Sequence, residues 1–371
     1  MNAPLIAPTF DTALADHLAR DIGGEVSIDG FGSQYMPLGS QPLVQSVRAG
    51  WVAPLTDLGV LRAEGEQAVQ FLHSQFTNDL ENLPEHHWQL TGYCSAKGRL
   101  LATLLAWRDT AQSVMLIAPQ PLIAGLRKRL SMFILRAKVR ITDDSGHWVV
   151  LGVGGERAAR ALAALPLDWP AIGAVSTGSA GHALGFAPVP VDPPTEPTAP
   201  AASTADVKSA RCLLIMPRGD LSRVWPTLSQ TLAPAPSFLW RWTEVRTGVP
   251  RIAAAGVEHF VPQMVNLDLV QGVSFRKGCY PGQEIVARSH YLGKLKRRMF
   301  LAHVTGEAPD AGTDVFAPGS AEPCGEVVTA ALSPEGGAHV LYESQIVSAE
   351  QARLADGRPL APVELPYALA L

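Results

Sequence analysis

The sequence predicts an α+β protein of more than one domain that ends in a small antiparallel β-barrel. Three observations lead to this prediction. The 371 residues exceed what one ordinary hydrophobic core organises. Strand-like and helix-like apolar patterns alternate up to about residue 232, as they do in α+β units. Beyond about residue 297, short apolar runs separated by Gly, Pro and Asp replace the helical patterns, which is typical of a barrel.

The first strong core pattern begins at Trp51 and predicts a strand, a helix and a further strand. The helical spacing covers 69–76 and is broken by the polar residues that follow it. The turn at 97–99 leads into an apolar run over 100–107, which predicts a strand. A second helix is expected next, because apolar residues recur on one face: Leu122, Ile123, Leu126, Leu130 and Phe133.

A second α+β segment is expected further along the chain. It comprises a strand over 148–153, an alanine-rich helix from Glu156 and a strand over 212–216. Asp220 then caps a helix over 221–232. Between these elements, the proline-rich stretch 188–200 predicts an extended surface loop. Residues 1–45 carry only a loose periodicity and predict a leader without an assigned element.

Composition limits the class of protein. Hydrophobic residues make up 47% of the chain and charged residues 17%, which excludes global disorder. The net charge of −4 gives no whole-protein reason to expect nucleic acid, so a basic partner surface must be local. Apolar runs are far shorter than the roughly 20 residues of a membrane helix, and the N-terminus lacks a secretory pattern. Four cysteines, none close to another in sequence, favour a reducing cytoplasm.

Cys279 is the candidate reactive residue. It lies between Gly278 and Gly282, which allow backbone geometry that a side chain forbids. Arg276 and Lys277 precede it directly, and nearby positive charge favours a thiolate. The alternative is that Cys279 is a small buried apolar residue, since nucleophilic catalysis also requires a positioned base. His290 is the nearest histidine, and the sequence does not show which residue it faces.

Two basic clusters are candidate partner surfaces. The run 275–298 holds seven basic residues against the single acid Glu284. The other cluster is Arg127, Lys128, Arg129, Arg136, Lys138 and Arg140. The second cluster could attract a polyanion such as a polyglutamate tail or RNA phosphates, and either cluster could simply be the solvated side of its element. The histidines have no partners at metal-ligand spacing, so no metal site is expected.

The stretch Lys277-Gly-Cys-Tyr-Pro-Gly-Gln-Glu284 resembles the K-G-C-Y-x-G-Q-E signature of the YgfZ-type proteins, a folate-binding family related to glycine-cleavage T-protein, an aminomethyltransferase. The segments 242–250 and 260–268 resemble the family sequence that leads into the signature, and 71–79 and 97–99 resemble its first helix and an early turn. The resemblance covers about residues 48–345.

This resemblance implies a three-domain T-protein-like fold around a central cleft in which tetrahydrofolate binds. A discontinuous folate-binding domain is then expected over 48–145 and 236–296, after an N-terminal extension over 1–47. An α+β domain over 146–235 would contain the proline-rich loop 187–205, and a β-barrel domain would cover 297–371.

The resemblance also implies a role. The family supports iron–sulfur enzymes or their assembly, including enzymes that modify tRNA, with the signature cysteine important. Cys279 is then the active element, with Lys277 favouring its thiolate. The residues implied in binding the folate or ordering the loop are Asn78, Lys97, Glu244, Arg246, Gln263, Gln283 and Glu284.

Two departures from T-protein favour an accessory role over catalysis. The strand that carries acids in T-protein is Arg99-Leu-Leu-Ala-Thr103 here, and it lacks the carboxylate that methylene transfer needs. Arg246 also takes the place of the glutamate that holds the pterin, although Glu244 could substitute from the same face of a strand. The alternatives are a folate-dependent aminomethyl or one-carbon transferase or demethylase, and a tRNA-binding protein that uses 127–129 or 297–298.

Overall fold

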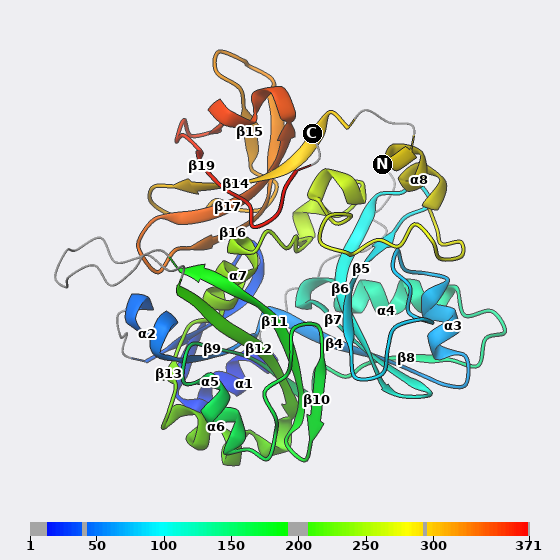
Figure 1. Cartoon of the computed structure of the whole chain (residues 1–371), viewed down its shortest axis with the longest axis vertical. Coiled ribbons are helices and arrows are strands. Elements are labelled where there is room, and N and C mark those ends of the chain that lie inside the picture. The colour runs from blue at the N-terminus through cyan, green and yellow to red at the C-terminus, as the bar shows by residue number, and fades with distance from the viewer. Residues whose placement is uncertain (1–12, 39–42, 192–206, 292–294, 370–371) are drawn as a thin grey trace.

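The computed structural model describes residues 13–38, 43–191, 207–291 and 295–369. It folds them into three larger β-sheets, a β-hairpin and the helices between them (Figure 1). Helices and strands are both abundant in the order of elements, so the expected α+β class is confirmed.

A five-stranded antiparallel sheet forms the right-hand part of Figure 1. Its central strands are apolar along most of their length because core side chains cover both faces. The strand expected at 100–107 and the helix after it are confirmed, except that Phe133 is 43% exposed. In sheet order the strands are β5 (Trp88–Cys94), β6 (Leu100–Thr110), β7 (Ser113–Pro119), β4 (Leu58–Glu64) and β8 (Arg140–Asp143). The helices beside this sheet are α3 (Ala68–His73), η1 (Gln120–Leu122) and α4 (Ile123–Met132).

A six-stranded sheet forms the lower part of Figure 1 and contains the expected strands over 148–153 and 212–216. All its neighbouring strands are antiparallel except the β13–β3 pair. In sheet order the strands are β10 (Val175–Gly178), β11 (Gly181–Val191), β12 (Val207–Pro217), β9 (Trp148–Gly154), β3 (Trp51–Pro54) and β13 (Ala233–Pro234). The helices beside this sheet are α5 (Ala158–Ala163), η2 (Arg218–Asp220) and α6 (Leu221–Ser229).

Three local expectations in this region need correction. Asp220 occupies the N-cap position of α6 but makes no side-chain capping bond, because its carboxylate instead accepts a 3.0 Å hydrogen bond from Arg223. The helix also ends at Ser229 rather than at 232. The start of the proline-rich stretch belongs to β11, which pairs with β12 up to Val191; the stretch beyond it, 192–206, lies outside the described residues.

The segment that precedes Trp51 contributes ordered elements to the core. Leu18 packs into the core beneath the six-stranded sheet. Tyr35 is fully buried, and its backbone N–H donates a 2.8 Å hydrogen bond to Ser237 Oγ. The loose periodicity of this segment predicted no element, so these elements correct that expectation. They are α1 (Ala13–Ile22), β1 (Gly24–Asp29), β2 (Gly32–Pro37) and α2 (Leu43–Ala49).

The C-terminal part is an antiparallel sheet that curls into a half-barrel at the upper left of Figure 1. A short 3-10 helix, η5 (Ile346–Gln351), follows β17. In sheet order the strands are β18 (Arg353–Leu354), β15 (Asp314–Phe316), β16 (Pro323–Leu332), β17 (Ala338–Gln345), β14 (Arg297–Val304) and β19 (Ala361–Val363).

Helix α7 (Ser237–Arg246) lies where the sheets meet (Figure 1). It contacts β16 and β17 of the half-barrel, β2 of the hairpin, and β3 and β11 of the six-stranded sheet. Every residue of α7 except Phe238 is buried, as expected of a helix surrounded by protein. The chain then continues through η3 (Ala254–Gly256) and η4 (Pro262–Val265) to α8 (Gln283–Tyr291).

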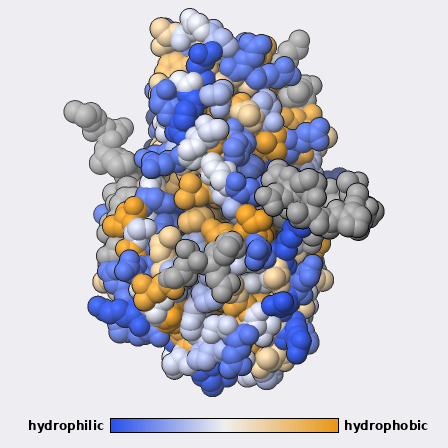
Figure 2. All heavy atoms as spheres, turned by 90° about the vertical axis from the view of Figure 1, so that its left-hand side faces the viewer, coloured by the Kyte–Doolittle hydropathy of each residue, from blue (hydrophilic) through white to orange (hydrophobic). Residues whose placement is uncertain are grey.

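The surface mixes polar and apolar side chains. Figure 2 shows the face on the left of Figure 1, where polar residues dominate the upper and lower parts and apolar ones gather near the middle. No helix among the described residues is long and apolar enough to span a membrane.

Candidate functional site

The signature loop that precedes α8 presents Cys279 to solvent. Cys94, Cys212 and Cys324 are buried, so Cys279 is the exposed one of the four free cysteines. The alternative that Cys279 is a small buried core residue is therefore wrong. His290 lies on α8 and stacks on Phe275, with the ring centroids 3.7 Å apart.

Lys277 ties the loop to the C-terminal end of α3. Its ammonium donates hydrogen bonds to the carbonyl oxygens of His73 and, at 2.6 Å, of Phe76. A cation is well placed there, since the last carbonyls of a helix lack partners within the helix. Burial lowers the pKa of Lys277 to about 8, and the charges of Asp79, Glu81 and Cys279 oppose that shift.

A contact between two glycine turns holds the other side of the loop. Gly282 has a φ of +78°, and a Cβ placed on it would lie 2.4 Å from the oxygen of Ser95 and 2.5 Å from the Cα of Gly98. Gly98 also has a positive φ, of +68°. Side chains at either position would separate the turns, so the two motifs found in the sequence pack directly on each other. Lys97 is exposed on the same turn.

His73 is a residue of the site that sequence reasoning missed. Its Nδ1 lies 3.3 Å from Asp79 Oδ1, and its Nε2 lies 3.8 Å from Glu81 Oε2. The same Nε2 lies 3.8 Å from where a Cβ on Gly278 would stand. Burial, followed by the charge of Lys277, lowers the pKa of His73. A histidine that ends a helix just before a polar turn was the available signal, but the loop it faces is about 200 residues away in sequence.

Asn78 and Gln263 hold the backbone around the loop. The Asn78 side-chain amide donates hydrogen bonds to the oxygens of Leu90 at 2.8 Å and Gln271 at 2.7 Å. The Gln263 amide donates one to the oxygen of Val286 in α8 at 2.7 Å. Both side chains therefore fasten segments that are distant in sequence.

Gln283 and Glu284 form the first turn of α8 directly after the loop. The backbone N–H of Gln283 donates a 3.1 Å hydrogen bond to the oxygen of Tyr280, which closes the turn. Glu284 is exposed, and an acidic side chain in the first turn of a helix is favoured by the helix dipole.

Glu244 belongs to a buried charge network on α7 rather than to a strand face. Its Oε1 accepts a 2.9 Å hydrogen bond from Trp240 Nε1, and its Oε2 lies 2.5 Å from Arg251 Nη2. The other terminal nitrogen of Arg251 lies 2.5 Å from Asp57 Oδ2. Burial raises the pKa of Glu244, and the charges of Arg251 and Arg211 oppose the shift.

The Arg246 side chain points toward the half-barrel. Its Nη1 lies 3.4 Å from Nε2 of His339 in β17 of the half-barrel. The expectation that Glu244 and Arg246 share a strand face is wrong because residues two apart on a helix do not face each other. The cofactor-binding residues expected from the sequence therefore fall into two groups, one around the loop and one on α7.

Two arginines of the basic run 275–298, both at the start of β14, pair with acids. Arg298 is 2% exposed and lies 2.7 Å from Asp268, and Arg297 pairs with Glu343. These two arginines therefore do not form a free solvated face. No three His, Cys, Asp or Glu side chains in the part of the chain that the structure describes gather as a metal site.

Comparisons with known proteins give consistent results. The chain is 32% identical over 266 residues to tRNA-modifying protein YgfZ of Edwardsiella ictaluri, which covers 70% of this chain and 73% of that protein. It is 28% identical over 284 residues to tRNA-modifying protein YgfZ of Colwellia psychrerythraea, which covers 74% and 78%. No family model matches the chain.

Among solved structures, the fold is similar to that of glycine cleavage system aminomethyltransferase T from Bartonella henselae. The TM-score is 0.70 over 97% of this chain and 98% of that one, at 14% sequence identity. The likeness confirms the expected T-protein-like fold.

Proposed function

The chain belongs to the YgfZ family, and on this basis we propose that it binds a folate and supports iron–sulfur enzymes, including those that modify tRNA, through the Cys279 loop. The observation that carries the proposal is the presentation of one exposed thiol on a loop held at both ends. The four free cysteines agree with the reducing cytoplasm that this role requires.

Cys279 is proposed to react as a thiolate with a client protein or a cluster intermediate. A thiolate, not a thiol, is the nucleophile and the metal ligand. Lys277 supplies a nearby positive charge, and its hydrogen bonds to the end of α3 fix the loop. His73 is proposed as a positioning residue, because it lies beside Gly278 and is itself held by Asp79 and Glu81.

The folate is proposed to bind between α7 and the loop. Two atoms in these regions support a polar ligand: Gln263 Oε1 and the Tyr280 hydroxyl are buried without a hydrogen-bond partner among the described residues. Buried polar atoms without partners are costly, so they favour a ligand that supplies the missing bonds. Glu244, Arg246 and Lys97 remain the proposed contacts to the pterin and to the acidic tail of the folate.

Calorimetric titration with tetrahydrofolate tests this part of the proposal. Wild-type protein is expected to bind saturably. Cys279→Ala is expected to bind with a free energy within about 0.5 kcal/mol of wild type, which is about twofold in Kd, because the thiol acts after binding. A wild-type protein that shows no saturable heat would remove the folate from the proposal. A variant that fails to bind would place the thiol in the folate site.

A second candidate function, RNA binding, is favoured by exposed cations on and after α4. Arg127, Lys128 and Arg136 are exposed and have no ion pair within the described ranges, whereas Lys138 and Arg140 pair with acids. A groove of about 550 Å³ runs beside them, lined by Ala124, Arg127, Lys128, Ser131, Met132 and Ile141. Exposed cations beside such a groove suit a phosphate backbone.

Salt-dependent binding of bulk tRNA tests this candidate. The double variant Arg127→Ala, Lys128→Ala is expected to weaken binding and to lower the slope of log K against log salt by about 0.9 for each phosphate that the protein no longer neutralises. The matched control is Arg157→Ala, Arg160→Ala, which removes two exposed charges near and on α5. Equal slopes for both double variants would show that α4 makes no specific contribution.

A further inference from the structure

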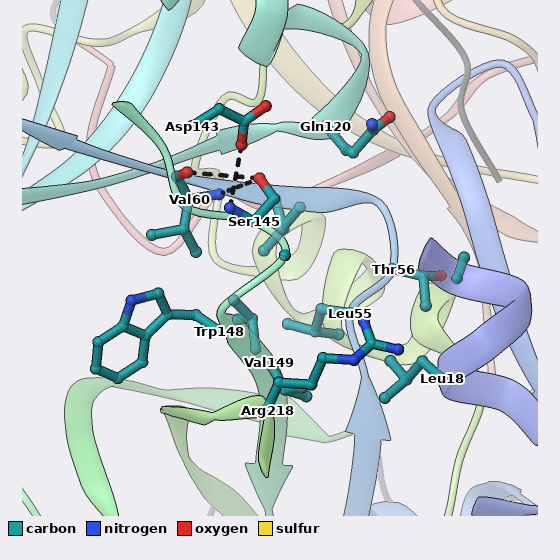
Figure 3. A pocket seen from close by; sticks show the side chains of 14 residues that line it. Leu18, Leu55, Thr56, Val60, Gln120, Asp143, Ser145, Trp148, Val149 and Arg218 are labelled. Carbon is teal, nitrogen blue, oxygen red and sulfur yellow. Dashed lines mark hydrogen bonds between the residues drawn. The ribbon is translucent and has the colours of Figure 1, made fainter. Parts of the chain in front are cut away.

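A cavity of about 310 Å³ lies between the five-stranded and six-stranded sheets, beside α1 (Figure 3). Its walls come from α1, the turn between β3 and β4, the loop after β8, β9 and η2. The residues that line it include Leu18, Leu55, Asp143, Ser145, Val149 and Arg218. The volume is at the small end of the range for ligand sites, roughly 300–1,000 Å³.

Arg218 supplies a cation to the cavity. Figure 3 shows its guanidinium reaching toward Leu18 and Thr56. Its Nη2 atom is buried and has no hydrogen-bond partner among the described residues. A buried donor without an acceptor costs free energy, and the cost is larger for a charged group. Its backbone N–H is paired, with a 2.8 Å hydrogen bond to the oxygen of His147, so the residue itself is held in place.

Asp143, the acid that lines the cavity, lies at the end opposite Arg218. Figure 3 shows Asp143 and Ser145 on the far side from the guanidinium. Asp143 Oδ1 accepts a 3.1 Å hydrogen bond from the backbone N–H of Ser145, and the Ser145 hydroxyl accepts one of 3.0 Å from that of Val60. These groups satisfy one another and do not neutralise Arg218.

Apolar side chains line the cavity between its two ends. Leu18, Leu55, Val149 and Val150 are at least nine-tenths buried, and they offer no hydrogen bonds to a ligand. A site that combines apolar walls with a few placed polar groups is the usual arrangement for a small ligand. A free phosphate would leave these walls uncovered, whereas an uncharged molecule would leave the guanidinium unpaired.

We propose that this cavity binds a small monocarboxylate with a compact apolar body, whose carboxylate accepts hydrogen bonds from Arg218 and whose body packs on the leucine and valine walls. Arginine suits this role because its planar guanidinium matches carboxylate geometry. No residue that lines the cavity lies in the signature loop or on α7, so the site stands independently of the proposed folate site.

Titration of the full chain by isothermal calorimetry tests the proposal. The probes are 3-phenylpropanoate and octanoate, each compared with its uncharged primary amide. Wild type is expected to bind at least one carboxylate, and Arg218→Gln is expected to lower that affinity by roughly tenfold to hundredfold, the range for removing a hydrogen bond to a charged group. The matched control is Arg223→Gln, since Arg223 is an exposed arginine of α6 that pairs with Asp220.

The outcomes separate the possibilities. Arg223→Gln should bind as wild type does, and thermal unfolding should show that both variants are folded. Equal affinity for carboxylate and amide, or unchanged affinity in Arg218→Gln, would overturn the charged anchor. Failure of wild type to bind either carboxylate at millimolar concentration would overturn the site. Tetrahydrofolate titrations of Arg218→Gln should match wild type, so a failure here is distinguishable from a failure of the proposed function.

Discussion

Replacing Cys279 by alanine is expected to abolish the support of iron–sulfur enzymes in cells while the fold stays intact. The side chain is exposed and makes no core contact, so the free energy of unfolding should change by less than about 0.5 kcal/mol. The thiol is the reactive group that the loop presents, so no neighbouring side chain can replace it. The measurement is the activity of an iron–sulfur tRNA-modifying enzyme in cells that lack the native protein and express the variant.

The control for this experiment is Arg276→Ala. Arg276 is an exposed neighbour in the same loop, and its removal changes the charge but keeps the thiol and the anchoring by Lys277. It should retain most of the activity. Cells in which Cys279→Ala restores enzyme activity as well as wild type does, at equal protein levels, would contradict the proposed role of the thiol.

Replacing Asp57 by asparagine is expected to lower the free energy of unfolding by about 3–5 kcal/mol. Asp57 is 1% exposed, and its Oδ2 lies 2.5 Å from Arg251 Nη1 and 3.6 Å from Arg241 Nη1. The variant leaves two buried guanidinium groups without this charge. Burying a charge that has lost its partner costs more than the pair contributes.

The measurement is urea unfolding at pH 7, followed by tryptophan fluorescence. The matched control is Asp220→Asn, whose exposed pair with Arg223 should contribute less than about 1 kcal/mol. Equal transition midpoints for the two variants would show that Arg241 and Arg251 are adequately satisfied by their other partners.

The Asp57 network explains why so large an effect is expected. Arg241 on α7 also reaches Asp29 of the N-terminal hairpin, at 2.5 Å, and donates a 3.1 Å hydrogen bond to the oxygen of Ala330 in the half-barrel. Arg251 adds Glu244. Removal of one carboxylate should therefore loosen the packing among three parts of the fold at once.

Local patterns in the sequence predicted much of the architecture. The apolar runs of β6 and β9 and the helical face of α4 appear at the predicted positions, because periodicity reflects which side of an element meets the core. The elements before Trp51 were not predicted, although α1 is as long as α4, so its apolar spacing was a signal that sequence reasoning missed. The prediction that the Asp220 side chain caps α6 was wrong, because its carboxylate accepts a hydrogen bond from Arg223 instead.

Local chemistry and spacing were enough to predict the α+β class, the signature that carries Cys279 and the glycine turns that flank it. Only the tertiary structure shows which groups the charged side chains pair with. Lys277 meets His73 at the end of α3 across 204 residues, and Arg251 meets Asp57 across 194. Arg218 Nη2 faces a cavity without a partner among the described residues. The partner of a buried charge depends on how distant sheets and helices pack, and no local pattern encodes that packing.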